Sequence, residues 1–110
     1  MPAPAHVVAA VRGWFEALIT ADAAALAKVA VPHPELASLA ARRVDPGTAT
    51  RLRAELERPQ LRILPIDDER SLAQVYLGGT VQLLPLQKQG DAVRIDARYA
   101  IAAMHADDAP

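Results

Sequence analysis

Residues 61–104, LRILPIDDERSLAQVYLGGTVQLLPLQKQGDAVRIDARYAIAAM, decide the fold of this chain. Short runs of β-type residues alternate there with turn residues, which is typical of consecutive strands. Gly78-Gly79 and Gly90-Asp91 are two-residue hairpin signals, because such turns need a positive φ, which glycine adopts without steric cost. We therefore predict an antiparallel meander of four strands, over residues 61–66, 71–77, 80–88 and 93–104.

Two-residue turns at both glycine sites determine which side chains share a face of this sheet, because successive strand residues point to opposite sides. One face is expected to carry Ala73, Val75, Leu84, Leu86, Val93, Ile95, Ala97 and Tyr99. The other face is expected to carry Tyr76, Val81, Leu83, Arg94, Asp96, Arg98, Ala100, Ala102 and also Leu72. A three-residue loop at Gly90 would exchange these partners.

The second of these faces is polar near Gly90 but apolar farther away, at Tyr76, Val81, Leu83, Ala100 and Ala102. An apolar group of this size exceeds the scattered hydrophobic residues of an ordinary protein surface. We therefore expect two copies of the chain to pair through this face as a homodimer. The alternative is that the C-terminal segment or a partner protein covers it.

The residues before position 60 have helical patterns. In residues 4–20 apolar side chains recur at helical spacing. Asp22 is expected to cap a second helix over 23–31, and Asp45-Pro46 to begin another that Pro59 ends; residues 34–43 are expected to hold a turn or two of helix. Helices first and a meander last predict one α+β domain over 1–110, with N-terminal helices packed on one face of a curved antiparallel sheet.

Composition excludes several kinds of chemistry. The 110 residues carry a net charge of −1 and no cysteine, which removes disulfides, thiol catalysis and zinc–thiolate sites. The start of the chain lacks a basic region and no apolar run is long enough to cross a bilayer. We expect a cytoplasmic protein without a cofactor and without a membrane span.

Two stretches resemble a known superfamily. Residues 14–28, WFEALITADAAALAK, are similar to the helix–Asp–helix opening of the nuclear transport factor 2-like superfamily, a cystatin-like α+β cone. Residues 84–96, LPLQKQGDAVRID, resemble the last hairpin of many of its small bacterial members. The resemblance implies a cone-shaped fold that can hold a small apolar ligand and can pair by its sheet. Residues 32–45 depart from the family pattern, in which a strand pair follows the second helix.

The resemblance extends to ketosteroid isomerase and its relatives, but their catalytic groups have no match here. Their phenol donor falls by spacing at Trp14, whose indole N–H cannot act as a proton-transfer acid. Their buried carboxylic acid falls near Leu83 or Leu84. The pattern is that of the scaffold without this catalytic set.

The ligand-binding residues expected of such a cone are Trp14, Leu18, His33, Leu84 and Tyr99. Trp14 beside Phe15 predicts either an aromatic wall of a cavity or core packing, and core packing is the more frequent role. Tyr99 is more often a hydrogen-bonded core tyrosine than a catalytic donor. His33, between two prolines, borders the mouth of the cone or lies on the surface.

Neither a metal nor a nucleic-acid site is expected from the charged residues. Asp67, Asp68 and Glu69 form an acidic turn with too few oxygen ligands for a closed cation site. The histidines His6 and His105, like His33, have no partner at chelating spacing. The arginines of the middle of the chain alternate with glutamates, which indicates ion pairs on helix surfaces rather than a nucleic-acid platform.

Three functions remain open from the sequence. The first is a non-catalytic module that binds a small apolar ligand or another protein. The second is an isomerase-, dehydratase- or hydrolase-like enzyme with Asp96, Glu16 or His33 as base. The third is an accessory or immunity-type protein. A carboxylate or histidine in an apolar pocket opposite Trp14 or Tyr99 would favour the enzyme, whereas ionisable groups placed outside would favour a module.

Overall fold

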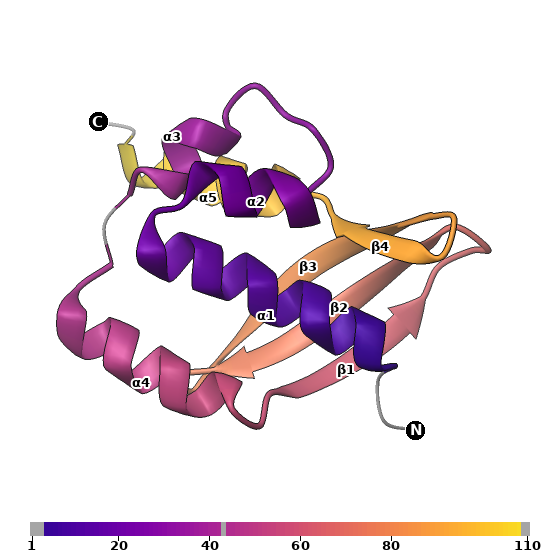
Figure 1. Ribbon diagram of the computed structural model, residues 1–110, viewed down its shortest axis with the longest axis horizontal. Coiled ribbons are helices and arrows are strands. Elements are labelled where there is room, and N and C mark those ends of the chain that lie inside the picture. Colours follow the sequence, from indigo (N-terminus) through magenta and orange to yellow (C-terminus); the bar gives the residue numbers. More distant parts are fainter. Residues whose placement is uncertain (1–3, 43, 109–110) are drawn as a thin grey trace.

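The computed structural model describes residues 4–42 and 44–108, which form helices followed by an open antiparallel sheet (Figure 1). The helices are α1 (Ala5–Thr20), α2 (Ala23–Val29), α3 (Leu36–Ala40), α4 (Pro46–Leu56) and α5 (Arg98–Asp108). The strands are β1 (Gln60–Pro65), β2 (Arg70–Leu77), β3 (Thr80–Gln89) and β4 (Ala92–Ile95). The predicted α+β class, with N-terminal helices on one face of the sheet, is confirmed, and the arrangement is compatible with a cone.

The predicted helix starts are confirmed by their caps. The Asp22 carboxylate accepts a hydrogen bond of 3.0 Å from the backbone N–H of Ala25. Asp45 accepts one of 3.1 Å from Thr48, with Pro46 in the first turn. Each carboxylate satisfies a backbone donor that the first turn of a helix leaves without a partner.

Gly13 allows α1 and α2 to pack closely. A Cβ atom at this position would lie 3.2 Å from Cγ1 of Val29 on α2, tighter than ordinary side-chain packing. The helical cost of glycine at this point is therefore offset by the approach of the second helix.

The sheet has the strand order β1-β2-β3-β4, each strand antiparallel to the next. Leu77 pairs with Thr80 and Gln89 with Ala92, so both glycine turns contain two residues, as predicted. Gly78, Gly79 and Gly90 have φ values of 60°, 80° and 63°, in the region that favours glycine. The register therefore follows the two-residue assignment.

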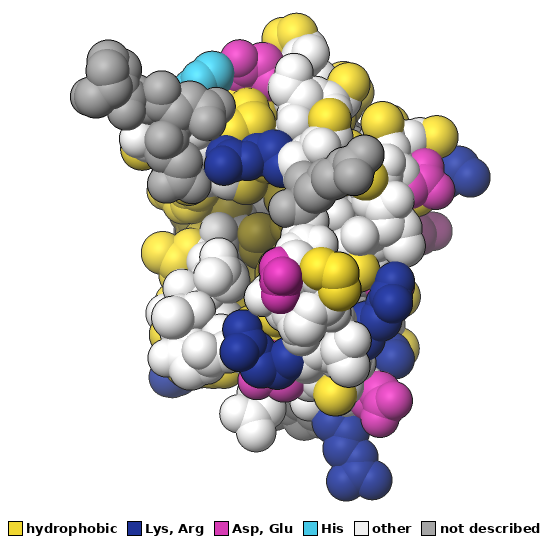
Figure 2. Space-filling view, turned by 90° about the vertical axis from the view of Figure 1, so that its left-hand side faces the viewer, with side chains coloured by type: hydrophobic (Ala, Val, Ile, Leu, Met, Phe, Trp, Pro, Cys, Tyr) yellow, Lys and Arg dark blue, Asp and Glu magenta, His cyan; other side chains and the backbone are white. Residues whose placement is uncertain are grey.

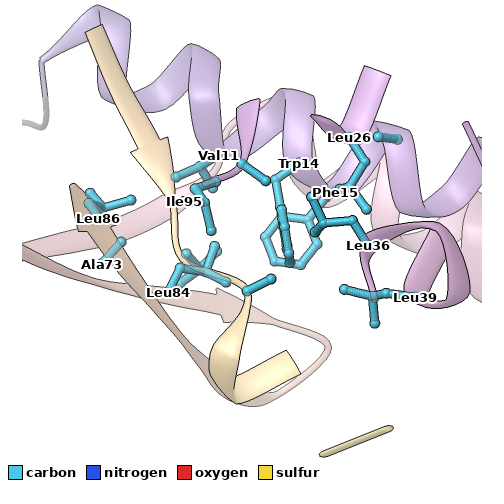
Figure 3. Packing of buried hydrophobic residues seen from close by; sticks show 14 of the residues in the cluster. Val11, Trp14, Phe15, Leu26, Leu36, Leu39, Ala73, Leu84, Leu86 and Ile95 are labelled. Atoms are coloured by element: carbon cyan, nitrogen blue, oxygen red, sulfur yellow. The ribbon is translucent and has the colours of Figure 1, made fainter. Parts of the chain in front are cut away.

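The core lies between α1 and the inner face of the sheet, the face turned toward the helices. Val11 and Trp14 of α1 are buried against this face (Figure 3). The predicted inner residues Ala73, Val75, Leu84, Leu86 and Ile95 are all buried. Trp14, at 1% exposure, holds the position between helix and sheet that large aromatic side chains commonly take in a core.

The prediction of a strand over residues 93–104 is wrong beyond Ile95. β4 ends there and α5 begins at Arg98. The Asp96 carboxylate accepts a hydrogen bond of 2.9 Å from the Arg98 backbone N–H, which supplies a partner for a donor at the start of the helix. Ala97, Ile101 and Met104 are buried, at the spacing of one face of a helix.

Three predicted site residues therefore lie on a helix instead of a strand. Tyr99, Ala100 and Ala102 lie on α5 and not on either face of the sheet. The carboxylate of Glu35, at the start of α3, lies 2.8 Å and 2.9 Å from Nε2 of His105 on α5. α5 thus packs beside α3 rather than extending the sheet (Figure 1).

The segment that follows α2 begins with an isolated bridge to β4. Ala30 pairs in parallel with Ile95, and the Val31 N–H donates a hydrogen bond of 2.8 Å to the Ile95 carbonyl. The segment then turns into α3. The turn or two of helix expected within residues 34–43 is α3 (Leu36–Ala40).

Candidate functional site

An apolar groove lies between α1, β3 and α5. It has a volume of about 390 Å³ and is open to solvent on one side. Figure 2 shows hydrophobic side chains (yellow) at the bottom of a hollow on the side of the molecule that it views. The nine described residues that line it, which we call the apolar groove, are Trp14, Phe15, Leu18, Gln82, Leu83, Leu84, Tyr99, Ala100 and Ala103.

The floor of the apolar groove is buried and its rim is exposed. Trp14 and Leu84, at 1% and 5% exposure, form the floor, and the Trp14 ring projects from α1 toward the sheet (Figure 3). Leu83 and Tyr99, at 42% and 52% exposure, form the rim. An apolar group that enters the groove would remove apolar surface of both rim side chains from water, which is favourable.

Four of the five predicted ligand-binding residues meet in this groove. Trp14, Leu18, Leu84 and Tyr99 all line it, although Tyr99 reaches it from a helix and is an exposed rim residue rather than a core tyrosine. His33 does not line it. It lies in the loop before α3, where its Nδ1 accepts a hydrogen bond of 3.0 Å from the Glu35 backbone N–H.

The contribution of α5 to the groove was not predicted from the sequence. Ala100 and Ala103 form part of its wall, but they were assigned to a strand or left without a role. The signal that identifies the helix is the spacing of Ala97, Ile101 and Met104 after a capping aspartate.

Asp96 is the buried carboxylate of the described residues, at 9% exposure. Burial alone would raise its pKa, but hydrogen bonds from the Arg98 side chain and backbone outweigh burial and hold the pKa below the ordinary value. Arg98 Nη2 lies 2.7 Å and Nε 2.9 Å from Oδ2 of Asp96. A carboxylate held ionised by two guanidinium N–H groups on one oxygen and a backbone N–H on the other is a weak base.

None of the three candidate bases is among the residues that line the groove. Glu16 is on the exposed side of α1, and His33 is exposed in its loop. Tyr99 is the one ionisable side chain among the nine that line the groove. The groove thus has an apolar floor and a phenol at its rim, without a carboxylate or imidazole beside Trp14.

The outer face of the sheet, turned away from the helices, carries an apolar patch. Tyr76, Val81 and Leu83 are 45%, 50% and 42% exposed, and Tyr76 lies directly across from Val81. We call the outer patch the six apolar residues Leu64, Leu72, Tyr76, Val81, Leu83 and Pro85. Of the predicted dimer residues, Ala100 and Ala102 are not part of it because they lie on α5.

A second hollow, of about 400 Å³, surrounds the acidic turn at residues 67–69. The Asp67 carboxylate accepts hydrogen bonds from the backbone N–H groups of Glu69 and Arg70 and from Arg70 Nε. These bonds lower the pKa of Asp67. The carboxylate is thus engaged within its own exposed turn, and the described residues include no group of three or more His, Asp or Glu that could hold a metal ion.

No helix in the described part of the chain is long and apolar enough to cross a membrane. Comparisons of the chain with models of protein families, with curated proteins and with solved structures found no match. The candidate site is therefore defined by its own geometry: an apolar groove at the side of the sheet, floored by the one tryptophan of the sequence.

Proposed function

We propose that this protein is a non-catalytic binding module whose apolar groove accepts an apolar group of a small ligand or of another protein. The observation that carries the proposal is that Trp14 and Leu84 form the buried floor of an open groove of about 390 Å³. Clefts of roughly 300–1,000 Å³ with apolar linings are the usual form of small-molecule sites.

The chemistry of the groove favours binding over catalysis. Acid–base catalysis needs a group within hydrogen-bond reach of the substrate proton and with a pKa near the working pH. Asp96, the buried carboxylate, is paired with Arg98 and has a lowered pKa. Tyr99 could donate a hydrogen bond to a ligand at the rim, which would orient the ligand without reacting with it.

The resemblance to the nuclear transport factor 2-like superfamily supports the same proposal. The two quoted stretches form a capped helix pair and a two-residue hairpin here, on opposite sides of one core. We place the site of action in the cytoplasm, since a small chain without cysteine lacks the disulfides typical of small secreted domains.

The test uses N-phenyl-1-naphthylamine, an uncharged apolar probe that becomes fluorescent in apolar surroundings. Trp14 is the single tryptophan, so energy transfer from it to the probe reports binding at the groove. Ala103→Glu places a carboxylate in the groove and should weaken probe binding by about tenfold or more, because a charge in an apolar site must be desolvated.

Ala102→Glu is the matched control. Ala102 is also exposed on α5 but does not line the groove, so its variant should bind the probe as the unchanged chain does. Equal binding by both variants, or no energy transfer from Trp14, would contradict the proposal.

A second proposal concerns assembly. The outer patch supports a homodimer in which two sheets pack face to face, because no described element covers it. A four-stranded sheet is roughly 20 Å wide at 4.8 Å per strand, which is the scale of a standard interface of about 800 Å² per partner. Sedimentation of the unchanged chain at micromolar concentration tests this proposal directly.

A further inference from the structure

Strand β3 is longer than β4, the strand on its second side. β2 pairs with β3 from Thr80 to Gln87, but β4 pairs only from Leu86 to Gln89. The chain then leaves the sheet at Asp96, whose N–H donates a hydrogen bond of 2.8 Å to the Pro85 carbonyl. Residues 80–84 of β3 thus have no described strand on their second side.

The direction of the backbone groups on this edge follows from two hydrogen bonds. The Lys88 N–H donates to the Glu69 carbonyl on the β2 side, and the Pro85 carbonyl accepts on the β4 side. Because the groups alternate along a strand, the N–H and C=O groups of Val81 and Leu83 point to the open side. No hydrogen bond to these four groups is found among the described residues.

This open edge borders the apolar groove. Gln82, Leu83 and Leu84 form one wall of the groove, with α1 and α5 on its other sides. An added strand in line with β4 would place every second side chain on the inner side, over Trp14, and the others beside Val81 and Leu83 on the outer side. The groove and the unpaired backbone groups are therefore two parts of one surface.

We propose that this surface binds an extended peptide as an added strand, antiparallel to β3, with an apolar side chain inserted in the apolar groove. The proposal rests on the binding function proposed for the groove and specifies its ligand. Strand addition obtains affinity from main-chain hydrogen bonds and specificity from pockets for alternate side chains. Here the backbone groups of Val81 and Leu83 would make the main-chain hydrogen bonds, and the groove would be the pocket for a side chain.

Charge and size favour a short peptide over a second copy of the chain. None of the nine groove residues is charged, so the inserted side chain should be uncharged. The open edge spans about five residues, or roughly 17 Å, and residues of α1 and α5 line the groove beside it. A second copy would have to bring its own α1 and α5 against those of the first to align the two edges, whereas a single extended segment carries no such elements.

The probe is the fluorescein-labelled peptide KTVTLTVTK, in which threonine alternates with valine and leucine. With the apolar side chains toward the groove, the threonine N–H groups face β3 and the leucine N–H faces away from it. N-methylation of the two threonines that flank the leucine should therefore weaken binding by about tenfold or more, whereas N-methylation of the leucine should leave it within about threefold.

A substitution in the protein, rather than in the peptide, tests the same edge. Val81→Pro removes an N–H that faces the open side and so leaves the β2 pairing intact. Val81 does not line the groove. The variant should weaken binding of the peptide by about tenfold and leave binding of N-phenyl-1-naphthylamine unchanged, while Val81→Thr should bind both. If Val81→Pro fails to fold, the N-methylated peptides still decide the question.

The outcomes separate this proposal from the one on which it rests. If the naphthylamine binds and the peptide does not bind even at millimolar concentration, strand addition is wrong and the binding function of the groove stands. Equal effects of the two kinds of N-methylation would also overturn strand addition. If Tyr76→Lys leaves a dimer intact, Val81→Pro converts that dimer to a monomer and neither form binds the peptide, a second copy occupies the edge instead. If neither probe binds, both proposals fall.

Discussion

The two halves of β3 differ in what lies beside and beneath them. The half from Leu86 to Gln89, which we call the closed half, pairs with β4 throughout and with β2 at Leu86 and Gln87, and Leu86 is 1% exposed; the half from Thr80 to Leu84 is called the open half. The half from Thr80 to Leu84 has β2 alone beside it, and Val81 and Leu83 are about half exposed. The first half completes the sheet, whereas the second leaves an edge, an apolar groove and part of the outer patch together.

The largest expected effect is the loss of the groove floor. Trp14→Ala should lower the free energy of unfolding by about 3–5 kcal/mol, because a large buried aromatic side chain leaves a cavity. Trp14→Phe keeps most of the apolar volume and should cost much less. Urea denaturation followed by circular dichroism measures both, and an alanine variant as stable as the unchanged chain would mean that Trp14 does not support the open half.

The next prediction compares the two halves of β3 directly. Leu86→Ala should cost about 2–5 kcal/mol because its side chain is fully enclosed. Leu83→Ala should cost less than about 1 kcal/mol, since its side chain is already partly in water. The two substitutions remove the same atoms, so thermal melts that shift equally would show that the two halves are equally packed.

Asp96 follows the last residue of β4, and its contribution to the stability of the fold depends on pH. Its lowered pKa means that it stabilises the fold above the carboxyl pKa of the unfolded chain, and that this stability is lost as the pH falls through the folded-state pKa. Asp96→Asn should therefore cost about 1–3 kcal/mol at neutral pH, and this cost should decline as the pH falls below about 4 toward the lowered pKa of Asp96 in the folded state.

The exposed pair Asp67–Arg70 is the control for this measurement. Its geometry is similar, with 2.7 Å between Arg70 Nη2 and Asp67 Oδ2, but water competes for both groups. Asp67→Asn should therefore have the smaller effect on denaturation curves recorded across the acid range. A pH-independent cost of Asp96→Asn would contradict the role assigned to the Asp96–Arg98 pair.

Both hairpins of the sheet were predictable because their signals are local. Gly78 and Gly90 determine the turns, and strict alternation between them determines which side chains face the helices. Leu84 could be placed on the inner face for the same reason, and Trp14 was placed from the aromatic pair that it forms with Phe15. Residues 96–104 could not be assigned to a helix from the sequence. Alanines are compatible with either a helix or a strand, and the apolar residues after Asp96 also fit an alternating strand pattern over a few residues.

The groove itself depends on this unpredicted helix. Tyr99 was assigned to the site on the assumption of a strand and reaches it from α5 instead. His33 was assigned to the mouth of the cone from its place between prolines, but the contacts of a loop are set by tertiary packing rather than by its own sequence. The sequence therefore predicted the inner wall of the groove and not the wall that closes it.

The smallest expected effect on stability is in the outer patch. Tyr76 is 45% exposed and lies outside the groove, so Tyr76→Lys should change the free energy of unfolding by no more than about 0.5 kcal/mol. If two copies pair through the outer patch, the same substitution places two lysines in the interface and should convert a dimer to a monomer in sedimentation, because buried like charges repel and lose hydration.

Gln60→Lys is the matched control for this substitution, because Gln60 lies across from Tyr76 at the margin of the same face and is already polar. It should leave the sedimentation of the chain nearly unchanged. An unchanged chain that sediments as a monomer at tens of micromolar would contradict pairing through the outer patch. The open half of β3 would then present both its edge and its outer face to other partners, and the peptide experiment would show whether the edge alone is used.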